Sequence, residues 1–289
     1  MMATAARLVS HRQRFGTAAS GWIRFCVRVF VLLYLGLVAS VSSRAAAPDI
    51  AEASAALLRS DTGQWLYTKA AETPHYPAST TKILTTLVAI ESGDLDRAIT
   101  VAAADTKVET SVVGLRAGQR VPLRALLYAA MLRSANDAAM TIARAVGGST
   151  ADFAALMNER AAAAGAKRSH FVNPHGLTDA HHLTTARDLA LITRAAMANP
   201  TFRQITGTKT YTWRYGAQPQ VLENHNHMLK TYTGCVGGKT GYTAAAGKTL
   251  VVVARRGGVE LIAVLLNGHG ERIWEDAEEL LDYGFARVR

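Results

Sequence analysis

Cysteine is nearly absent from this sequence, which has two among its 289 residues. Cys26 lies in a segment with the features of an export signal, so Cys235 alone would remain in the mature chain and no internal disulfide could form. We therefore expect Cys235 to be a small buried residue and not a nucleophile. A chain of this length can bury a substantial core, and that core must stabilise the fold without disulfides.

Acidic residues are missing from the first 47 positions, which hold six arginines. These are Arg7, Arg12, Arg14, Arg24, Arg28 and Arg44. Without them the net charge falls from +10 to +4, because 26 basic and 22 acidic residues remain. The rest of the chain has no basic stripe with interleaved aromatic residues, so we expect no binding to nucleic acid.

Apolar runs long enough to cross a membrane are also missing. The run Val29–Val41 is shorter than the roughly 20 residues that a spanning helix needs. It follows a basic segment and precedes small residues, which predicts a signal peptide over 1–47 with cleavage after Ala47 or after Ser43. The alternative is an uncleaved N-terminal membrane anchor. Either way residues 48–289 would be exported, to the outer face of the cytoplasmic membrane, to the periplasmic or cell-wall space, or to the medium.

Hydrophobic periodicity predicts elements of both kinds. Alternating apolar residues on both sides of Asp61–Gly63 predict a β-hairpin. A helix is predicted from Pro77 to about Ser92, and because it is apolar nearly all round it should be buried. Residues 120–200 are rich in alanine and predict further helices, the last ending at Asn199-Pro200.

Strands return after this helical block. They are predicted at 208–213, 248–256 and 259–266, of which the last two form a hairpin, and a helix follows at 271–283. The order predicts a mixed α/β (α+β) fold, with an antiparallel sheet flanked by helices and an inserted all-helical lobe.

Three short motifs occur in a fixed order, S-x-x-K at 79–82, S-x-N at 134–136 and K-T-G at 239–241. Chance supplies roughly one S-x-x-K in a chain of this length, but K-T-G in only about one chain in ten. The first motif opens the predicted buried helix, and the third precedes a predicted strand. In order and context this trio resembles that of the class A β-lactamases and penicillin-binding proteins, and the resemblance implies one serine-based catalytic site.

The spacing of the first motif suits an activated nucleophile. Ser79 and Lys82 are three residues apart and share a helix face, so the lysine can reach the hydroxyl. A serine hydroxyl is a poor nucleophile until a base takes its proton. Lys82 can be that base only when neutral, and burial together with a nearby cation such as Lys239 would lower its pKa.

The other two motifs supply groups that this pair lacks. Ser134 could relay a proton to a leaving amine, and Asn136 could hold a substrate amide, although a turn or helix cap is the simpler reading of that motif. Lys239 and Thr240 could bind an extended peptide at a strand edge, with the cation holding a terminal carboxylate.

The segments around these motifs resemble the low-molecular-mass penicillin-binding proteins, the D-alanyl-D-alanine carboxypeptidase family of serine peptidases. The similar segments include YPASTTKILTTLVA, LLYAAMLRSANDAA, ENHNHMLKTYTGCVGGKTGYTAAAGKTLVVVA and LLDYGF. The resemblance covers nearly all of 50–289 and implies a β-lactamase/transpeptidase-like fold. It implies one catalytic domain at 48–289 without the family's frequent C-terminal β domain, and we expect a monomer.

The resemblance also implies a reaction. Ser79 would be acylated by a peptidoglycan stem peptide, terminal D-Ala would leave, and water would hydrolyse the acyl-enzyme. β-Lactam antibiotics would acylate the same serine, and neither cofactor nor metal is implied.

The backbone N–H groups of Ser79 and Tyr242 would form the oxyanion hole. Ser79, Lys82 and Ser134 would be catalytic, and substrate would be bound by Asn136, Lys239, Thr240, Gly241, Tyr242, Thr243 and Arg272.

One of these residues departs from the family's pattern. The family often has an arginine before the last helix that helps to bind the substrate carboxylate. Arg272 lies one position away, and Ile273 takes the expected place.

Other functions stay open at this stage. An endopeptidase or transpeptidase acting on the same peptides would use the same motifs. A class A β-lactamase would need an E-x-x-L-N stretch, whereas Glu159 is followed by Arg-Ala-Ala-Ala. A scaffold would be expected to lose a motif. A metal hydrolase would draw on residues whose spacing is not that of a helical zinc motif, namely His175, Asp179, His181, His182, His225 and His227.

Overall fold

The computed structural model describes residues 46–215 and 218–288. The predicted export signal therefore lies outside the described residues, apart from Ala46 and Ala47. Over the described ranges no helix is both long and apolar enough to cross a membrane.

One five-stranded antiparallel sheet forms the centre of the fold, in the order β2-β1-β9-β8-β7. Its strands are β1 (Ser54–Arg59), β2 (Trp65–Lys69), β7 (Cys235–Thr243), β8 (Gly247–Arg256) and β9 (Val259–Gly268). Both predicted hairpins are confirmed, since β1 pairs with β2 and β8 with β9. Because β1 pairs with β9, strands from the beginning and from the end of the described chain belong to one sheet. The K-T-G motif lies inside edge strand β7, and β8, the strand predicted after the motif, follows it.

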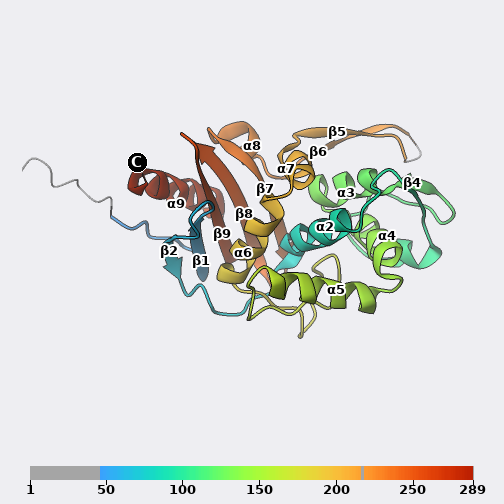
Figure 1. Cartoon of the computed structure of the whole chain (residues 1–289), viewed down its shortest axis with the longest axis horizontal. Helices are drawn as coiled ribbons and strands as arrows, with labels where there is room; N and C mark the ends of the chain where they lie inside the picture. The colour runs from blue at the N-terminus through green and yellow to red at the C-terminus, as the bar shows by residue number, and fades with distance from the viewer. Residues whose placement is uncertain (1–45, 216–217, 289) are drawn as a thin grey trace, which may run out of the picture. The chain divides into compact units, whose positions relative to one another are not determined.

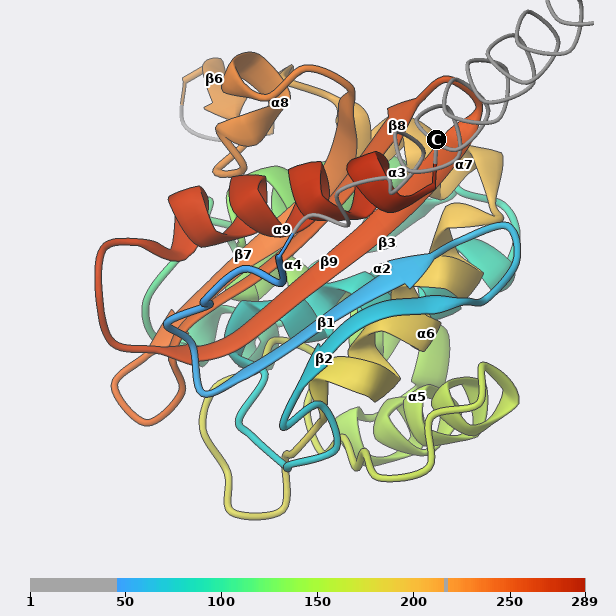
Figure 2. The same cartoon turned by 90° about the vertical axis from the view of Figure 1, so that its left-hand side faces the viewer.

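Helices cover both faces of the sheet, which explains why β8 and β9 are apolar runs and not alternating ones. Helix α9 (Ile273–Arg287) packs on one face, where Leu57, Val252 and Leu281 share a core. The helical lobe packs on the other, where Leu58, Val251 and Ile262 belong to a second core. Figure 1 shows the sheet between α9 and the lobe, and Figure 2 shows α9 lying across the sheet. The predicted mixed architecture is confirmed.

The lobe lies between the strand groups in sequence, as predicted. Its helices are α2 (Lys82–Glu91), α3 (Leu123–Leu132), α4 (Asn136–Gly147), α5 (Thr150–Ala163), α6 (Ala186–Met197) and α7 (Pro200–Gly207). Short elements complete the described chain, namely η1 (Ala78–Thr81), η2 (Ala103–Lys107), α8 (Met228–Thr231), and the strand pairs β3 (Ala98–Thr100) with β4 (Arg120–Pro122) and β5 (Thr210–Trp213) with β6 (Gln220–Glu223).

Helix α7 was not predicted. The sequence Asn199-Pro200 was interpreted only as the end of α6, but it also begins α7. The Asn199 side chain accepts hydrogen bonds from the backbone of Thr201 and Phe202, and Pro200 occupies the first turn, where its missing N–H costs nothing.

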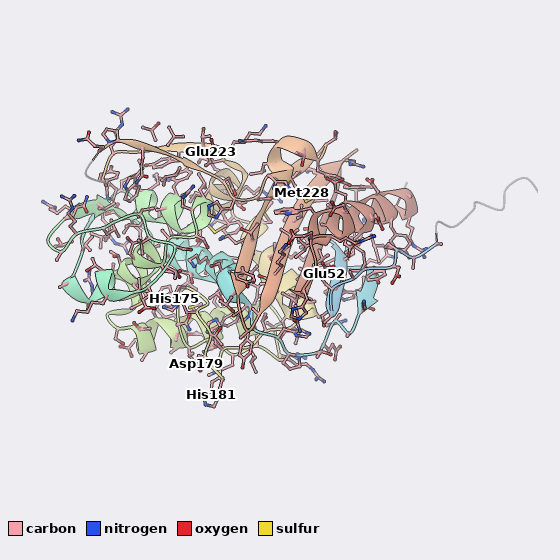
Figure 3. All side chains as sticks on the ribbon, turned by 180° about the vertical axis from the view of Figure 1, so that it is seen from behind. Glu52, His175, Asp179, His181, Glu223 and Met228 are labelled. Carbon is pink, nitrogen blue, oxygen red and sulfur yellow. The ribbon has the colours of Figure 1, made fainter. Side chains whose placement is uncertain are left out.

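A long loop connects α5 to α6 and returns to the body of the protein. Two isolated backbone bridges hold the loop close to the point where it enters α6. Thr184 of the loop pairs with His75, and Leu183 pairs with His170, which lies on the other arm of the loop. Figure 3 shows Asp179 and His181 at its outer end, with His175 closer to the helices. The loop therefore brings the backbone around His175 against the start of α2.

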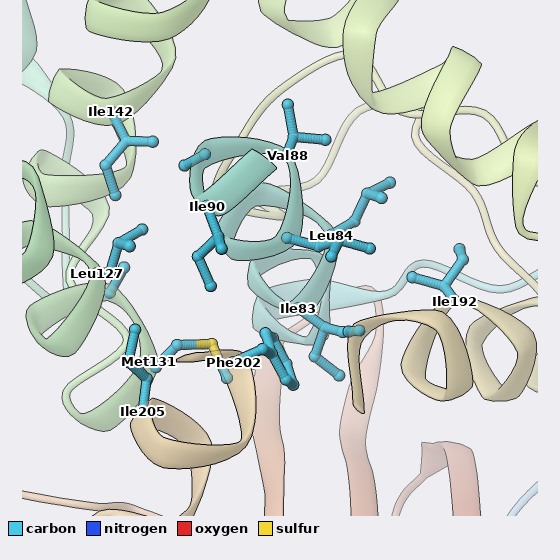
Figure 4. Close-up of a cluster of buried hydrophobic side chains, with 14 of the residues drawn as sticks. Ile83, Leu84, Val88, Ile90, Leu127, Met131, Ile142, Ile192, Phe202 and Ile205 are labelled. Carbon is cyan, nitrogen blue, oxygen red and sulfur yellow. The ribbon is translucent and has the colours of Figure 1, made fainter. Parts of the chain in front are cut away.

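Helix α2 is buried on every side, as predicted. Nine of its ten residues, Lys82 to Ile90, are buried, and Glu91 alone is exposed. Ile83, Leu84 and Val88 pack among side chains from α3, α4, α6 and α7 (Figure 4). Because such packing is dense, the first turn of α2 is held in a fixed position relative to the sheet.

Candidate active site

Ser79 lies in η1, the 3-10 turn that leads into α2. Ala78 before it has a positive φ of 48°, an uncommon conformation for a residue with a side chain. The Thr80 hydroxyl donates to the oxygen of Pro77 (2.6 Å), and the Thr249 hydroxyl of β8 donates to the same oxygen (3.0 Å). The turn that carries Ser79 is therefore tied to the sheet.

Glycines let two other segments approach this turn. A Cβ at Gly241 on β7 would lie 2.8 Å from the Ser79 backbone nitrogen and 2.4 Å from Thr249 Oγ1. A Cβ at Gly176, whose φ is +88°, would lie 1.8 Å from the Ala78 oxygen. Both contacts are closer than any side chain allows, so glycine is required at each position.

Lys82 is fully buried, and its Nζ atom lies 3.1 Å from Ser79 Oγ. The same nitrogen donates to Asn136 Oδ1 (2.8 Å) and to the backbone oxygen of His175 (2.7 Å). Burial lowers the pKa of Lys82 well below its usual value, and the charge of Lys239 lowers it further, while Asp137 opposes the shift. Burial and the charge of Lys239 therefore both favour the neutral amine in the side chain that faces the serine.

Ser134 and Lys239 form a second buried pair. Lys239 Nζ donates to Ser134 Oγ (3.1 Å) and to the oxygen of Thr240 (2.9 Å). Ser134 joins α3 to α4 with a positive φ of 60°. Burial lowers the pKa of Lys239 to about 7.

The predicted residues of β7 lie along the edge of the sheet. Tyr242 is 67% exposed, the largest exposure among the bulky hydrophobic residues that the structure describes. Thr243 Oγ1 accepts a hydrogen bond from Thr178 of the loop between α5 and α6 (3.0 Å). This bond ties the end of β7 to the loop whose His175 contacts Lys82.

Arg272 is not brought to this group. Its guanidinium pairs with Asp276 (3.0 Å) and Glu279 (3.4 Å), both on α9. Its proposed contact with the substrate carboxylate stays a prediction.

Cys235, expected to be buried, is only half-buried, and burial raises the pKa of its thiol.

The histidines of the loop serve structural contacts. His182 Nε2 lies 2.9 Å from Thr81 Oγ1, and His182 Nδ1 accepts from the backbone of Val172 (3.0 Å). Burial lowers the pKa of His175 to about 3. Within the described residues no group of three or more His, Cys, Asp or Glu side chains is placed to hold a metal ion.

Glu159, the acid weighed for a β-lactamase-like deacylation, lines a surface groove of about 350 Å³ with Val88 and Glu91. Val88 and Glu91 lie at the carboxyl end of α2, with Glu159 of α5 beside them, whereas Ser79 precedes the amino end of α2. Ten residues of helix span about 15 Å, so Glu159 is remote from the serine.

Sequence reasoning missed two contributors. The His175 carbonyl is a backbone group 93 residues from Lys82, and no side-chain pattern signals it. Asp137 directly follows the S-x-N motif and was passed over, although an acid beside a catalytic motif was a visible signal.

Fold and site together define a DD-peptidase of the penicillin-binding class, with a serine, two buried lysines and an edge strand in one place. Residues 41–270 match the family described as D-alanyl-D-alanine carboxypeptidase, Peptidase S11. The chain belongs to this serine peptidase family, as its motifs had indicated.

Individual relatives agree with this assignment. D-alanyl-D-alanine carboxypeptidase DacB2 of Mycobacterium tuberculosis is 40% identical over 232 residues, 78% of this chain and 79% of the relative. A D-alanyl-D-alanine endopeptidase of Pseudomonas aeruginosa is 30% identical, over 77% of this chain and 76% of the relative.

Solved structures share the fold. The crystal structure of the D-alanyl-D-alanine carboxypeptidase of M. tuberculosis H37Rv superposes with a TM-score of 0.81 and 37% identity, covering 85% of this chain and 95% of that one. The Streptomyces K15 DD-transpeptidase gives 0.78 and 33%, covering 83% and 99%.

Proposed function

We propose that this protein is a D-alanyl-D-alanine carboxypeptidase that removes the terminal D-Ala of peptidoglycan stem pentapeptides through an acyl-enzyme on Ser79. Family membership supports the reaction class. The observation that carries the residue assignment is the environment of Lys82, which places its amine 3.1 Å from the serine hydroxyl and lowers its pKa by burial.

The contacts of Lys82 Nζ account for its role as a base. A neutral amine has two N–H bonds and one lone pair. Asn136 Oδ1 and the His175 oxygen are acceptors and take the two hydrogens. The third neighbour is the Ser79 hydroxyl, which can donate, so the lone pair is directed toward its proton.

In the first step Ser79 Oγ attacks the carbonyl carbon of the penultimate D-Ala while its proton passes to Lys82 Nζ. The tetrahedral oxyanion is held by the N–H groups of Ser79 and Tyr242. Ser134 Oγ gives its proton to the nitrogen of the departing D-Ala as the C–N bond breaks, and it is reprotonated with the proton that Lys82 took up, which leaves Lys82 neutral again. Lys82 then takes a proton from the water that attacks the ester, and it returns this proton to Ser79 Oγ as the acid product leaves.

Substrate binding uses the edge of β7. A peptide adds to the strand as an extra β-strand, with Thr240 and Thr243 beside it and Asn136 holding its amide. The protonated Lys239 holds the terminal carboxylate. A β-lactam places its ring carbonyl at the same point and acylates Ser79.

We further propose that residues 1–47 direct export or anchor the chain, and that 48–289 is one monomeric catalytic domain acting on the cell wall. Family members act on peptidoglycan, which supports an extracytoplasmic site. Amino-terminal sequencing of the protein from membrane and culture fractions separates cleavage from anchoring.

Endopeptidase or transpeptidase activity is the second candidate, because relatives with both names share the fold or sequence. The three activities differ in the bond cleaved and in the acceptor. Purified protein should release free D-Ala from a stem pentapeptide, and Ser79→Ala should release none. Cleavage of cross-linked stem-peptide dimers, or transfer of the tetrapeptide acyl group to an added amine in place of its release as the free acid, would favour the second candidate instead.

A further inference from the structure

Asp137 is a buried carboxylate that the proposed mechanism does not use. It follows Asn136 in the first turn of α4 and is 2% exposed. Among the described residues it forms no salt bridge. Its oxygens accept from the backbone N–H groups of Val113 (3.2 Å to each oxygen), Leu115 (3.0 Å) and Ala138 (2.9 Å).

Val113 and Leu115 belong to the segment 109–115, which lies against Asn136. Thr110 and Ser111 in this segment have positive φ values of 55° and 46°. Each such residue costs on the order of 1 kcal/mol or more and persists only where surrounding contacts hold it. The hydrogen bonds to Asp137 are contacts of that kind, placed directly after the strained pair.

The same segment surrounds Asn136 with acceptors. The Asn136 amide nitrogen Nδ2 donates to the oxygens of Glu109 (3.2 Å) and Thr110 (3.1 Å), and its backbone N–H donates to the Ser111 oxygen (2.7 Å). A carboxamide turned by 180° would place its oxygen against two carbonyl oxygens. The segment therefore fixes the orientation in which Oδ1 faces Lys82.

We infer that Asp137 is a positioning residue for acylation, because it holds segment 109–115 in the conformation that orients the Asn136 carboxamide toward Lys82. The chain of contacts runs from Asp137 to the segment, from the segment to the Asn136 amide, and from its Oδ1 to Lys82 Nζ (2.8 Å). This inference rests on the proposed role of Lys82 as the base for Ser79.

Asp105 offers a matched control. It is also 2% exposed and packs beside α4, where it pairs with Arg144 (2.8 Å) and accepts from the backbone of Ala102 (2.9 Å). It makes no contact with Asn136. Asp105→Asn thus tests the general effect of neutralising a buried carboxylate in this lobe.

The experiment measures the rate of acylation by a fluorescent penicillin, from pH 5 to 9, for wild type, Asp137→Asn, Asp105→Asn, Asn136→Ala and the Asp137→Asn/Asn136→Ala pair. Thermal unfolding of each variant identifies a temperature at which all of them are folded, and the acylation rates are compared at that temperature. We expect Asp137→Asn to acylate about 10- to 100-fold more slowly while folded. We also expect its acidic limb to move to lower pH, because the charge that raises the pKa of Lys82 is gone.

Two further results are expected of a residue that acts through Asn136. Asp105→Asn should acylate at the wild-type rate, and Asp137→Asn should add little to Asn136→Ala. Fully multiplicative losses in the double variant, or a wild-type rate for Asp137→Asn, would overturn the inference. If the wild-type protein is not acylated on Ser79, the proposed function fails and the inference fails with it. If the wild-type protein is acylated and Asp137→Asn is acylated at the same rate, the inference alone is contradicted.

Discussion

Lys82 Nζ lies 3.1 Å from Ser79 Oγ and is shielded from solvent completely, and this burial favours an uncharged amine beside the serine hydroxyl. Replacing Lys82 by Met should preserve the fold, because the methionine fills a similar apolar volume. Acylation by penicillin should fall at least about 1,000-fold, since the hydroxyl then lacks a base. Lys82→Arg should be equally slow, because a guanidinium stays protonated. An arginine variant that acylates at a tenth of the wild-type rate would contradict this account.

Lys239 should set the alkaline limit of peptide turnover. Its pKa of about 7 means that it loses its charge as the pH rises through 7, and the substrate carboxylate then loses its cation. We expect kcat/KM for a stem peptide to fall above about pH 7 in wild type. In Lys239→Arg the charge persists, so this decline should disappear, whatever the absolute rate. The two pH profiles, measured on one peptide, decide the matter, and superimposable profiles would refute the assignment.

Gly241 should tolerate no side chain. A Cβ at this position would meet the Ser79 backbone nitrogen and Thr249 Oγ1, and β7 would have to move away from the nucleophile. We expect Gly241→Ala to reduce acylation by about 100-fold. Gly257→Ala in the β8–β9 turn is a useful control, because a Cβ there meets nothing within 4 Å; since the φ of Gly257 is +54°, this variant also tests whether a strained backbone alone slows acylation. The prediction fails if both variants acylate equally fast.

A buried pair of acids outside the candidate active site should make the free energy of unfolding depend on pH. Glu52 is 3% exposed beside the fully buried Asp276, and burial, reinforced by that neighbour, raises the pKa of Glu52 from 4.5 to about 7. Between these values the folded state binds the proton more tightly than the unfolded chain does. Stability should therefore fall as the pH rises from about 4.5 to 7.

Glu52→Gln removes this dependence, because an amide does not ionise. We expect the variant to exceed wild type by roughly 1–2 kcal/mol at pH 8 and to match it at pH 4.5. Chemical denaturation at the two pH values measures the difference. Exposed Glu72 provides the control, since Glu72→Gln should change stability little at either pH. An equal effect of Glu52→Gln at both pH values would be the contrary outcome.

Local signals made part of this structure predictable. The i, i+3 spacing of Ser79 and Lys82 fixes their contact once a helix forms, and the apolar surroundings of Lys82 predicted its burial. The turn at Gly257-Gly258 predicted the β8–β9 hairpin. These features depend on a few neighbouring residues, so a single sequence suffices to find them.

Other features depend on long-range packing. The His175 oxygen reaches Lys82 only because the loop between α5 and α6 returns to α2, and Gly176 permits that approach. Arg272 shows the reverse case. Its i, i+4 spacing to Asp276 was a readable sign of an ion pair at the start of the last helix, which the sequence analysis did not use. Its contact with the substrate carboxylate stays a prediction.

The central claim is that Ser79 forms the acyl-enzyme. The direct measurement incubates wild type and Ser79→Ala with a fluorescent penicillin and locates the adduct by mass spectrometry after denaturation. The account predicts a covalent adduct on the peptide that contains Ser79 in wild type and none in the variant. A labelled Ser79→Ala protein, or an unlabelled wild type, would contradict it.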